Sequence, residues 1–296
     1  MIITTDRSSA IFNLSKREYP FRSQEIEVPG GVMSYIDEGV GDPIVFVHGL
    51  GTWSYLFRRL IRQHSLRHRC IAPDHIGFGR SERPHEFSYT PSAHARNFKL
   101  LMNSLDLTNI TLVVHDLGGP IGLSYAMENV DRIARVVLLN TKMWDDPSPS
   151  GNLSSHGLMR WMAERTHLSA RIVKSSFVDR NKFFPEFVDP ANQAEGPSLS
   201  QYGSWETSCQ AQNAGPWMNE LWSQRHSLQD KPLKMIWGTL DSQLGEKALN
   251  KWWHDFPLAE VERINDAGRY AIEERPEAVS SQLRSFMSAN NRGFLA

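Results

Sequence analysis

The feature of this sequence that most constrains its fold is a series of short apolar runs separated by turn residues. They read PIVFVHG, RCIAPD, ITLVVHD, RVVLLNT and LKMIWG, and helical patterns such as WSYLFRRLIRQH and GPIGLSYAMEN lie between them. Runs without polar alternation fit strands that are buried on both faces, as in a parallel sheet. Intervening helices supply the crossovers that parallel strands need. We therefore predict an α/β fold with a mostly parallel central sheet flanked by helices.

A hairpin is predicted before these runs. Residues 25–37, EIEVPGGVMSYID, alternate around a Pro-Gly-Gly turn, which is typical of two antiparallel strands with one solvated face. A chain of 296 residues with 40% apolar content can bury one large core, so we expect a single domain with an insertion.

Residues 142–225 interrupt the rhythm of runs and helices, and we predict that they form an inserted helical lid. Residues 1–141 and 226–296 then form the core. The insertion is rich in large apolar residues, which are candidates for lining an apolar substrate pocket. The alternative is that most of them form the lid's own core and its contact with the sheet, because large apolar residues are usually buried for packing. The candidates for the pocket are Trp144, Trp161, Trp205, Trp217 and Trp222.

Charge and cysteine content narrow the class of partner. The chain has 32 basic and 33 acidic residues without a run of like charge, which argues against nucleic acid and anionic membranes and favours a small-molecule substrate. Cys70 and Cys209 lie far apart, so a disulfide framework is not expected. The N-terminus lacks the apolar core of a signal peptide, and no apolar run approaches the roughly 20 residues of a membrane span. We expect a cytoplasmic monomer or homodimer without metal or cofactor.

Residues 110–119, ITLVVHDLGG, place an acidic residue at the end of an apolar strand, before two glycines and a helix. A nucleophile elbow needs small residues around its central side chain, because neighbouring backbone comes close, and Gly118 and Gly119 supply them. Asp116 then projects at the helix N-terminus, where the helix dipole favours its ionised, nucleophilic form. The alternative is that Asp116 merely caps the helix.

The segment VHGLG, residues 47–51, ends another predicted strand. In a sheet of this type the backbone N–H of Leu50 faces the elbow and forms an oxyanion hole with the N–H of Leu117. His48 is interpreted as a structural histidine, because a side chain before such a turn points beneath the loop.

These motifs, together with CIAPDHIGFGRS at 70–81, VLLNT at 137–141 and WGTLD through AGRYAIEE at 237–274, resemble the α/β-hydrolase superfamily. Within it, the chain is similar to haloalkane dehalogenases and to the β-lactone decarboxylases of olefin biosynthesis, over residues 20–141 and 228–285. The resemblance implies that Asp116 attacks an electrophilic carbon to form an alkyl-enzyme ester, with Asp241 orienting the base that activates water. The base of the family is the histidine of an AGH-aromatic pattern, where this chain has Arg269.

The leaving-group positions also depart from the family. Dehalogenases hold halide with an Asn or Trp beside the HG turn and with a Trp after the nucleophile, whereas this chain has Leu50 and Leu117. Neither leucine has a side-chain donor, which argues against dehalogenation.

A guanidinium stays protonated and has no lone pair for a proton from water, so Arg269 does not act as a general base. The first attack needs no base, because a carboxylate is already ionised, so the cycle is expected to stop at ester hydrolysis.

At the histidine position Arg269 would lie between Asp116 and Asp241 and pair with either. It would alternatively hold a substrate carboxylate or oxyanion in a lyase, cyclase or isomerase, with Asp116 as acid or base. Two further explanations are an inactive, ligand-binding homologue and a substitution introduced to trap an intermediate, and the leucines argue against the latter.

The other histidines are weak candidates for the base. His115 is expected to point away from the elbow. Five other histidines are predicted on surface helices or loops. Three more, in or beside the lid, remain alternatives for the base because the lid is expected to lie near the active site. The surface group comprises His64, His68, His85, His94 and His254, and the lid group His156, His167 and His226.

Overall fold

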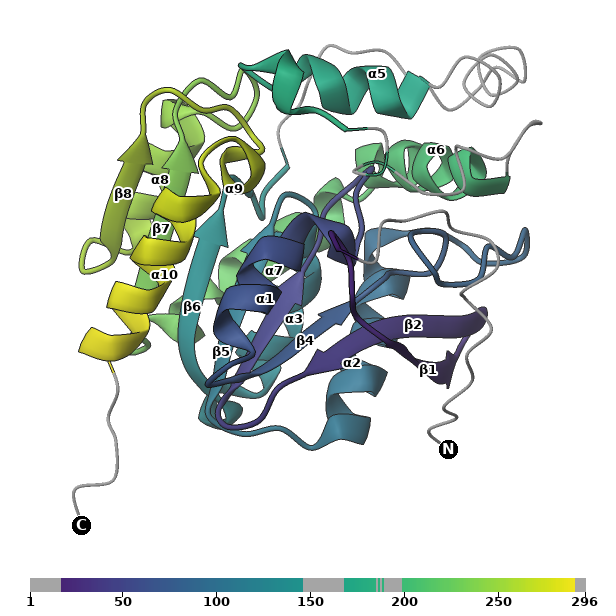
Figure 1. Cartoon of the computed structure of the whole chain (residues 1–296), viewed down its shortest axis with the longest axis horizontal. Helices are drawn as coiled ribbons and strands as arrows, with labels where there is room; N and C mark the ends of the chain where they lie inside the picture. Colours follow the sequence, from purple (N-terminus) through teal and green to yellow (C-terminus); the bar gives the residue numbers. More distant parts are fainter. Residues whose placement is uncertain (1–16, 146–167, 185, 187, 189–198, 291–296) are drawn as a thin grey trace.

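A computed structural model describes residues 17–145, 168–184, 186, 188 and 199–290 of the chain. Its centre is an eight-stranded sheet in the order β1-β2-β4-β3-β5-β6-β7-β8 (Figure 1). The strands are β1 Ser23–Val28, β2 Gly31–Glu38, β3 Pro43–Val47, β4 Arg69–Pro73, β5 Ile110–His115, β6 Ile133–Leu139, β7 Leu233–Gly238 and β8 Glu260–Ile264.

The sheet is parallel from β4 through β8, and β1 and β2 form the antiparallel hairpin at its edge. β2 continues the sheet by pairing antiparallel with β4. The predicted mostly parallel α/β sheet and the predicted hairpin are therefore confirmed.

Helices cover both faces of this sheet, and successive residues of each central strand pack into opposite cores. In β5, Leu112 and Val114 join the core beneath α2 and α3, whereas Val113 joins the core beneath α1 and α10. This alternation explains why every residue of β3 and β5 is buried. The helices are α1 Arg58–His64, α2 Pro91–Leu105, α3 Gly118–Glu128, α8 Glu246–Asp255, α9 Ala271–Glu274 and α10 Pro276–Ala289, with 3-10 turns at Ser54–Phe57 and Val130–Arg132.

The segment between β6 and β7 contains α5 Leu168–Ser175, α6 Leu199–Gln212 and α7 Gly215–Gln224, with 3-10 turns at Arg180–Lys182 and Arg225–Leu228. In Figure 1, α5 and α6 lie at the end of the molecule toward which the arrows of β6 and β8 point. The carboxyl ends of parallel strands are where α/β proteins place their ligands. The lid boundaries at 142 and 225 stay a prediction.

Two further features bear on the class of protein. Cys70 and Cys209 are both buried, and neither is in a disulfide bond. In the part of the chain that the structure describes, no helix has the length and apolar character to span a membrane.

Candidate active site

Asp116 lies in a strained turn at the carboxyl end of β5. Its φ of 50° is in the left-handed region, which non-glycine residues rarely adopt. The turn is held by its own backbone: the carbonyl of Asp116 accepts from the Thr141 hydroxyl at 2.6 Å and from the N–H of Gly119 at 3.0 Å. This strand-turn-helix geometry directs the Asp116 side chain away from the sheet, as an elbow requires.

Three glycines around the elbow are required by space. A Cβ at Gly118 would overlap the carbonyls of Val47 and His48, and one at Gly119 would overlap the Thr141 hydroxyl. A Cβ at Gly49 would overlap the Asp116 side chain. The loop after β3 and the elbow after β5 therefore approach each other more closely than any larger residue allows.

That close approach brings the Leu50 N–H onto the Asp116 carboxylate, with 2.9 Å between Leu50 N and Asp116 Oδ2. The predicted oxyanion-hole donor thus binds one oxygen of Asp116, the predicted nucleophile, and leaves Oδ1 to other partners. Leu117 immediately precedes α3. The side chains of both leucines are partly buried and pack against the two cores of the sheet.

Arg269 lies between the two carboxylates. Its Nε is 3.1 Å from Asp241 Oδ2, its Nη2 is 3.2 Å from Asp241 Oδ1, and its Nη1 is 3.5 Å from Asp116 Oδ1. The exposed fractions of the side chains are 14% for Arg269, 13% for Asp116 and 2% for Asp241, so all three charges are largely withdrawn from water. Burial acts to lower the pKa of Arg269, but Asp116 and Asp241 outweigh it and raise that pKa above its ordinary value. Arg269 is therefore a permanent cation at this site.

Asp241 lies in the loop after β7, and both of its carboxylate oxygens accept hydrogen bonds. Oδ1 accepts from the N–H groups of Gln243 and Leu244 as well as from Arg269. Burial acts to raise the pKa of Asp241, but the charge and hydrogen bonds of Arg269, with these two N–H groups, hold it below its ordinary value.

Two residues of this network were not predicted from the sequence. Asn140 donates to Asp241 Oδ2 at 3.3 Å and exchanges hydrogen bonds with the backbone of Gly238, which joins the ends of β6 and β7. Gln243 accepts from Arg269 Nη2 at 2.8 Å. Asn140 was part of the quoted VLLNT motif, so a polar side chain at the end of a buried strand was a signal for it. Nothing in the sequence pattern distinguished Gln243.

Among the described residues, no histidine forms a hydrogen bond with the Asp116 carboxylate. His115 points beneath the elbow, with Nε2 3.0 Å from the Arg269 carbonyl, and His48 Nε2 accepts from the backbone N–H of His75. The predicted surface location is wrong for His64 and His94, which are 4% and 1% exposed. His94 lies on the same stripe of α2 as Phe98 and Leu101, so helical spacing was the signal that could have found it. His226 is exposed, and His156 and His167 lie outside the described residues.

The buried histidines predict a loss of stability in mild acid. Burial lowers the pKa of His75 to about 4, and burial with repulsion by His75 holds the pKa of His48 and His94 well below the ordinary value. The unfolded chain therefore binds more protons below its ordinary histidine pKa of about 6.5, so the free energy of unfolding falls as pH drops from there toward 4, by up to about 1.4 kcal/mol per pH unit per histidine.

The measurement is urea unfolding between pH 7.5 and 5, with His94→Gln beside the exposed control His254→Gln. The His94 variant is expected to show a shallower pH dependence than wild type, and the His254 variant an unchanged one. Equal slopes in all three proteins would contradict neutral burial of His94.

The predicted pocket tryptophans are placed as follows. Trp144 and Trp222 form an aromatic cluster with Trp252 of α8, with ring centroids 4.9 to 5.7 Å apart, and Trp217 packs against the same core. Trp205 is partly buried in α6, and Trp161 lies outside the described residues. The contacts of Trp144 and Trp222 fit the core alternative, and the lining of a pocket by these tryptophans stays a prediction. Among the described residues, no three His, Cys, Asp or Glu side chains are grouped to hold a metal.

Comparison with known proteins identifies the family of this fold. Residues 42–276 match the family model for the alpha/beta hydrolase fold. The chain is 30% identical to the cis-3-alkyl-4-alkyloxetan-2-one decarboxylase of Shewanella oneidensis, over 91% of this chain and 89% of that protein. It is 31% identical to haloalkane dehalogenase 2 of Mycobacterium bovis, over 90% of this chain and 94% of that protein.

Among solved structures, haloalkane dehalogenase DatA from Agrobacterium tumefaciens C58 superposes with a TM-score of 0.79 at 22% identity, over 94% of this chain and 100% of that one. The resemblance predicted from the motifs is therefore confirmed. This chain belongs to the alpha/beta hydrolase fold family and is a hydrolase-like enzyme related to haloalkane dehalogenases and oxetanone decarboxylases.

Proposed function

We propose that the chain acts on a small, largely apolar electrophile with Asp116 as nucleophile, and that Arg269 keeps the reaction from ordinary hydrolytic turnover. One observation carries this proposal: the position that faces both Asp116 and Asp241 holds a guanidinium, 3.1 Å from Asp241 and 3.5 Å from Asp116. A carboxylate displaces a leaving group without a base, but hydrolysis of the resulting ester requires an activated water.

In the attacking step Asp116 Oδ1 forms a bond to carbon while the bond to the leaving group breaks and its electron pair departs with that group. Oδ2 stays bound to the Leu50 N–H throughout. Once esterified, Asp116 is neutral, and Arg269 loses one of its two carboxylate partners. The guanidinium is then free to bind the anion that the step releases, which fits a leaving group such as a carboxylate or alkoxide better than it fits a neutral amine.

A second candidate is a lyase reaction on a β-lactone, which the decarboxylase relative and the missing base favour together. Asp116 attacks the saturated ring carbon that is bonded to the ring oxygen, and that carbon–oxygen bond breaks. The lactone opens to a carboxylate, which remains attached to the substrate. Loss of carbon dioxide then moves its electron pair into a carbon–carbon double bond and expels Asp116 as carboxylate. No water and no general base take part, so Arg269 is compatible with the whole cycle.

Intact-protein mass spectrometry after incubation with a haloalkane, an epoxide, an ester and a β-lactone tests both candidates. We expect a lasting mass increase located on Asp116 and absent from Asp116→Asn. Release of carbon dioxide from the β-lactone would identify the lyase instead. Steady hydrolytic turnover by the wild-type protein would contradict the arrest. Ligand binding that survives in Asp116→Asn, with no product from either protein, would point to a non-catalytic homologue.

A further inference from the structure

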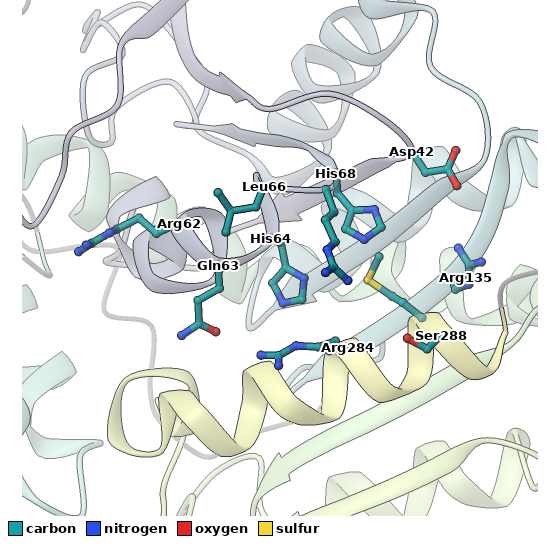
Figure 2. Close-up of a pocket in the computed structure, with 11 residues that line it drawn as sticks. Asp42, Arg62, Gln63, His64, Leu66, His68, Arg135, Arg284 and Ser288 are labelled. Atoms are coloured by element: carbon teal, nitrogen blue, oxygen red, sulfur yellow. The ribbon is translucent and has the colours of Figure 1, made fainter.

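A groove near the amino ends of the parallel strands, opposite the carboxyl ends where Asp116 lies, has the character of a ligand site. It has a volume of about 640 Å³ and lies between the end of α1, the start of β6 and α10. Figure 2 shows His64 and His68 on one side of this space and Arg284 and Ser288 of α10 on the other. Asp42, His68 and Arg135 each lie at or just before the amino end of a parallel strand, whereas Asp116 follows a carboxyl end.

The lining of the groove is strongly basic. Four arginines and two histidines face a single carboxylate, that of Asp42, although the whole chain has a net charge of −1. In the described part of the chain, none of these four arginines forms an ion pair with a carboxylate. Elsewhere in the fold buried arginines are matched, as Arg58 is by the Glu273 carboxylate, with two hydrogen bonds of 2.8 Å. The four are Arg62, Arg67, Arg135 and Arg284.

Arg135 shows the imbalance most clearly, because it is only 4% exposed. Its Nε and Nη2 donate to the Asn290 carbonyl at 3.2 and 2.8 Å, and its Nη1 donates to the Thr111 hydroxyl at 3.3 Å. These acceptors are neutral, and burial lowers the pKa of Arg135. Asp42 acts to raise that pKa but does not outweigh burial, so an anion in the groove would further offset the cost of burying this cation.

The histidines add donors to the same space. His64 is 4% exposed, and its ring lies 6.3 Å from that of His68. Burial lowers the pKa of His68, although Asp42 acts to raise it. A neutral imidazole has one ring N–H, so each of these two histidines has a donor for an anion in the groove.

We propose that this groove binds the phosphate group of a small organic phosphate. A phosphate carries close to two negative charges and three or more acceptor oxygens, which matches several guanidinium groups around one space better than a single carboxylate does. The volume falls within the roughly 300–1,000 Å³ of small-molecule sites, so there is room for an organic portion beyond the phosphate. The site is separate from Asp116 and takes no part in the reaction proposed there.

The test is isothermal titration with inorganic phosphate and with phenyl phosphate at constant ionic strength. Arg284→Gln and Arg67→Gln remove exposed arginines of the groove, and Arg96→Gln removes an exposed arginine of α2 as the matched control. Each groove variant is expected to bind phenyl phosphate roughly tenfold more weakly, and Arg96→Gln and Asp116→Asn to bind it like wild type.

Tighter binding of phenyl phosphate than of inorganic phosphate supports an organic phosphate as ligand. Equal binding of the two probes, with loss in the groove variants, would limit the site to inorganic phosphate and overturn the organic part of the proposal. No saturation of the wild type up to roughly 10 mM, or equal weakening in Arg96→Gln, would overturn the site itself.

Discussion

Arg269→His is expected to convert a protein that retains its alkyl-enzyme ester into one that hydrolyses it. The imidazole would lie between the same two carboxylates, with Asp241 accepting its N–H and the second ring nitrogen free to take a proton from water. Asp241 is held for this role by the N–H groups of Gln243 and Leu244, which the substitution leaves in place. A positioned general base accelerates such a step by roughly 10²- to 10⁴-fold.

The measurement follows adduct mass and released product over time for an electrophile that labels Asp116 in the wild type. Arg269→Gln is the matched control, because it removes the cation without supplying a base, and we expect its adduct to persist. The double variant Asp116→Asn with Arg269→His should form no adduct and no product. Equal adduct lifetimes in Arg269→His and Arg269→Gln would show that more than the base is missing.

Asp241→Asn is expected to lower the free energy of unfolding by roughly 3 kcal/mol, the low end for breaking a buried ion pair, because Asp116 remains beside Arg269. Both carboxylate oxygens of Asp241 only accept hydrogen bonds. Oδ1 accepts from Gln243, Leu244 and Arg269, and Oδ2 accepts from Arg269 and Asn140. In either orientation the amide of asparagine turns an NH₂ group toward donors, so hydrogen bonds are lost together with the charge.

Urea unfolding at pH 7 measures this change. Asp266→Asn is the control, because Asp266 also pairs with an arginine, Arg275, but in solvent, and its loss should change stability little. Since the folded-state pKa of Asp241 is lowered, its contribution is present above the unfolded pKa of about 3.9 and is lost as pH falls through the lower folded value. The difference between wild type and Asp241→Asn should therefore shrink below about pH 4. Equal stability at pH 7 would contradict the role given to Arg269 as a buried partner.

Local pattern was enough to predict the strands and the elbow. Every residue of the runs that became β3 and β5 is buried because both faces of the sheet are covered, and the Pro-Gly-Gly turn became the β1–β2 hairpin. Asp116 could be singled out because a strand end, two glycines and a helix start stand next to one another in the sequence. Such signals depend only on residues that are neighbours in the sequence, so they can be recognised without knowledge of the fold.

The contacts within the site depended on residues far apart in the sequence. Leu50 and Asp116 are separated by 66 positions, and Asn140 and Asp241 by 101. The roles of Gln243 and Asn140 follow only from the ends of β6 and β7 being adjacent. His64 and His94 looked like surface residues because a polar side chain on a helix is usually exposed, but the stripe that carries His94 packs into the core.

The sequence by itself determined the α/β architecture and the acidic residue of the turn after β5, and it predicted that Arg269 occupies the position of the family's histidine. Each of these depends on adjacent residues or on the chemistry of one residue. Only the tertiary structure decided that Arg269 is shared by Asp116 and Asp241, that the Leu50 N–H binds one oxygen of Asp116, and that four arginines meet in a groove at the amino ends of the parallel strands. Charge pairing and burial are properties of distance in space, and distance is set by packing the sheet and its helices together.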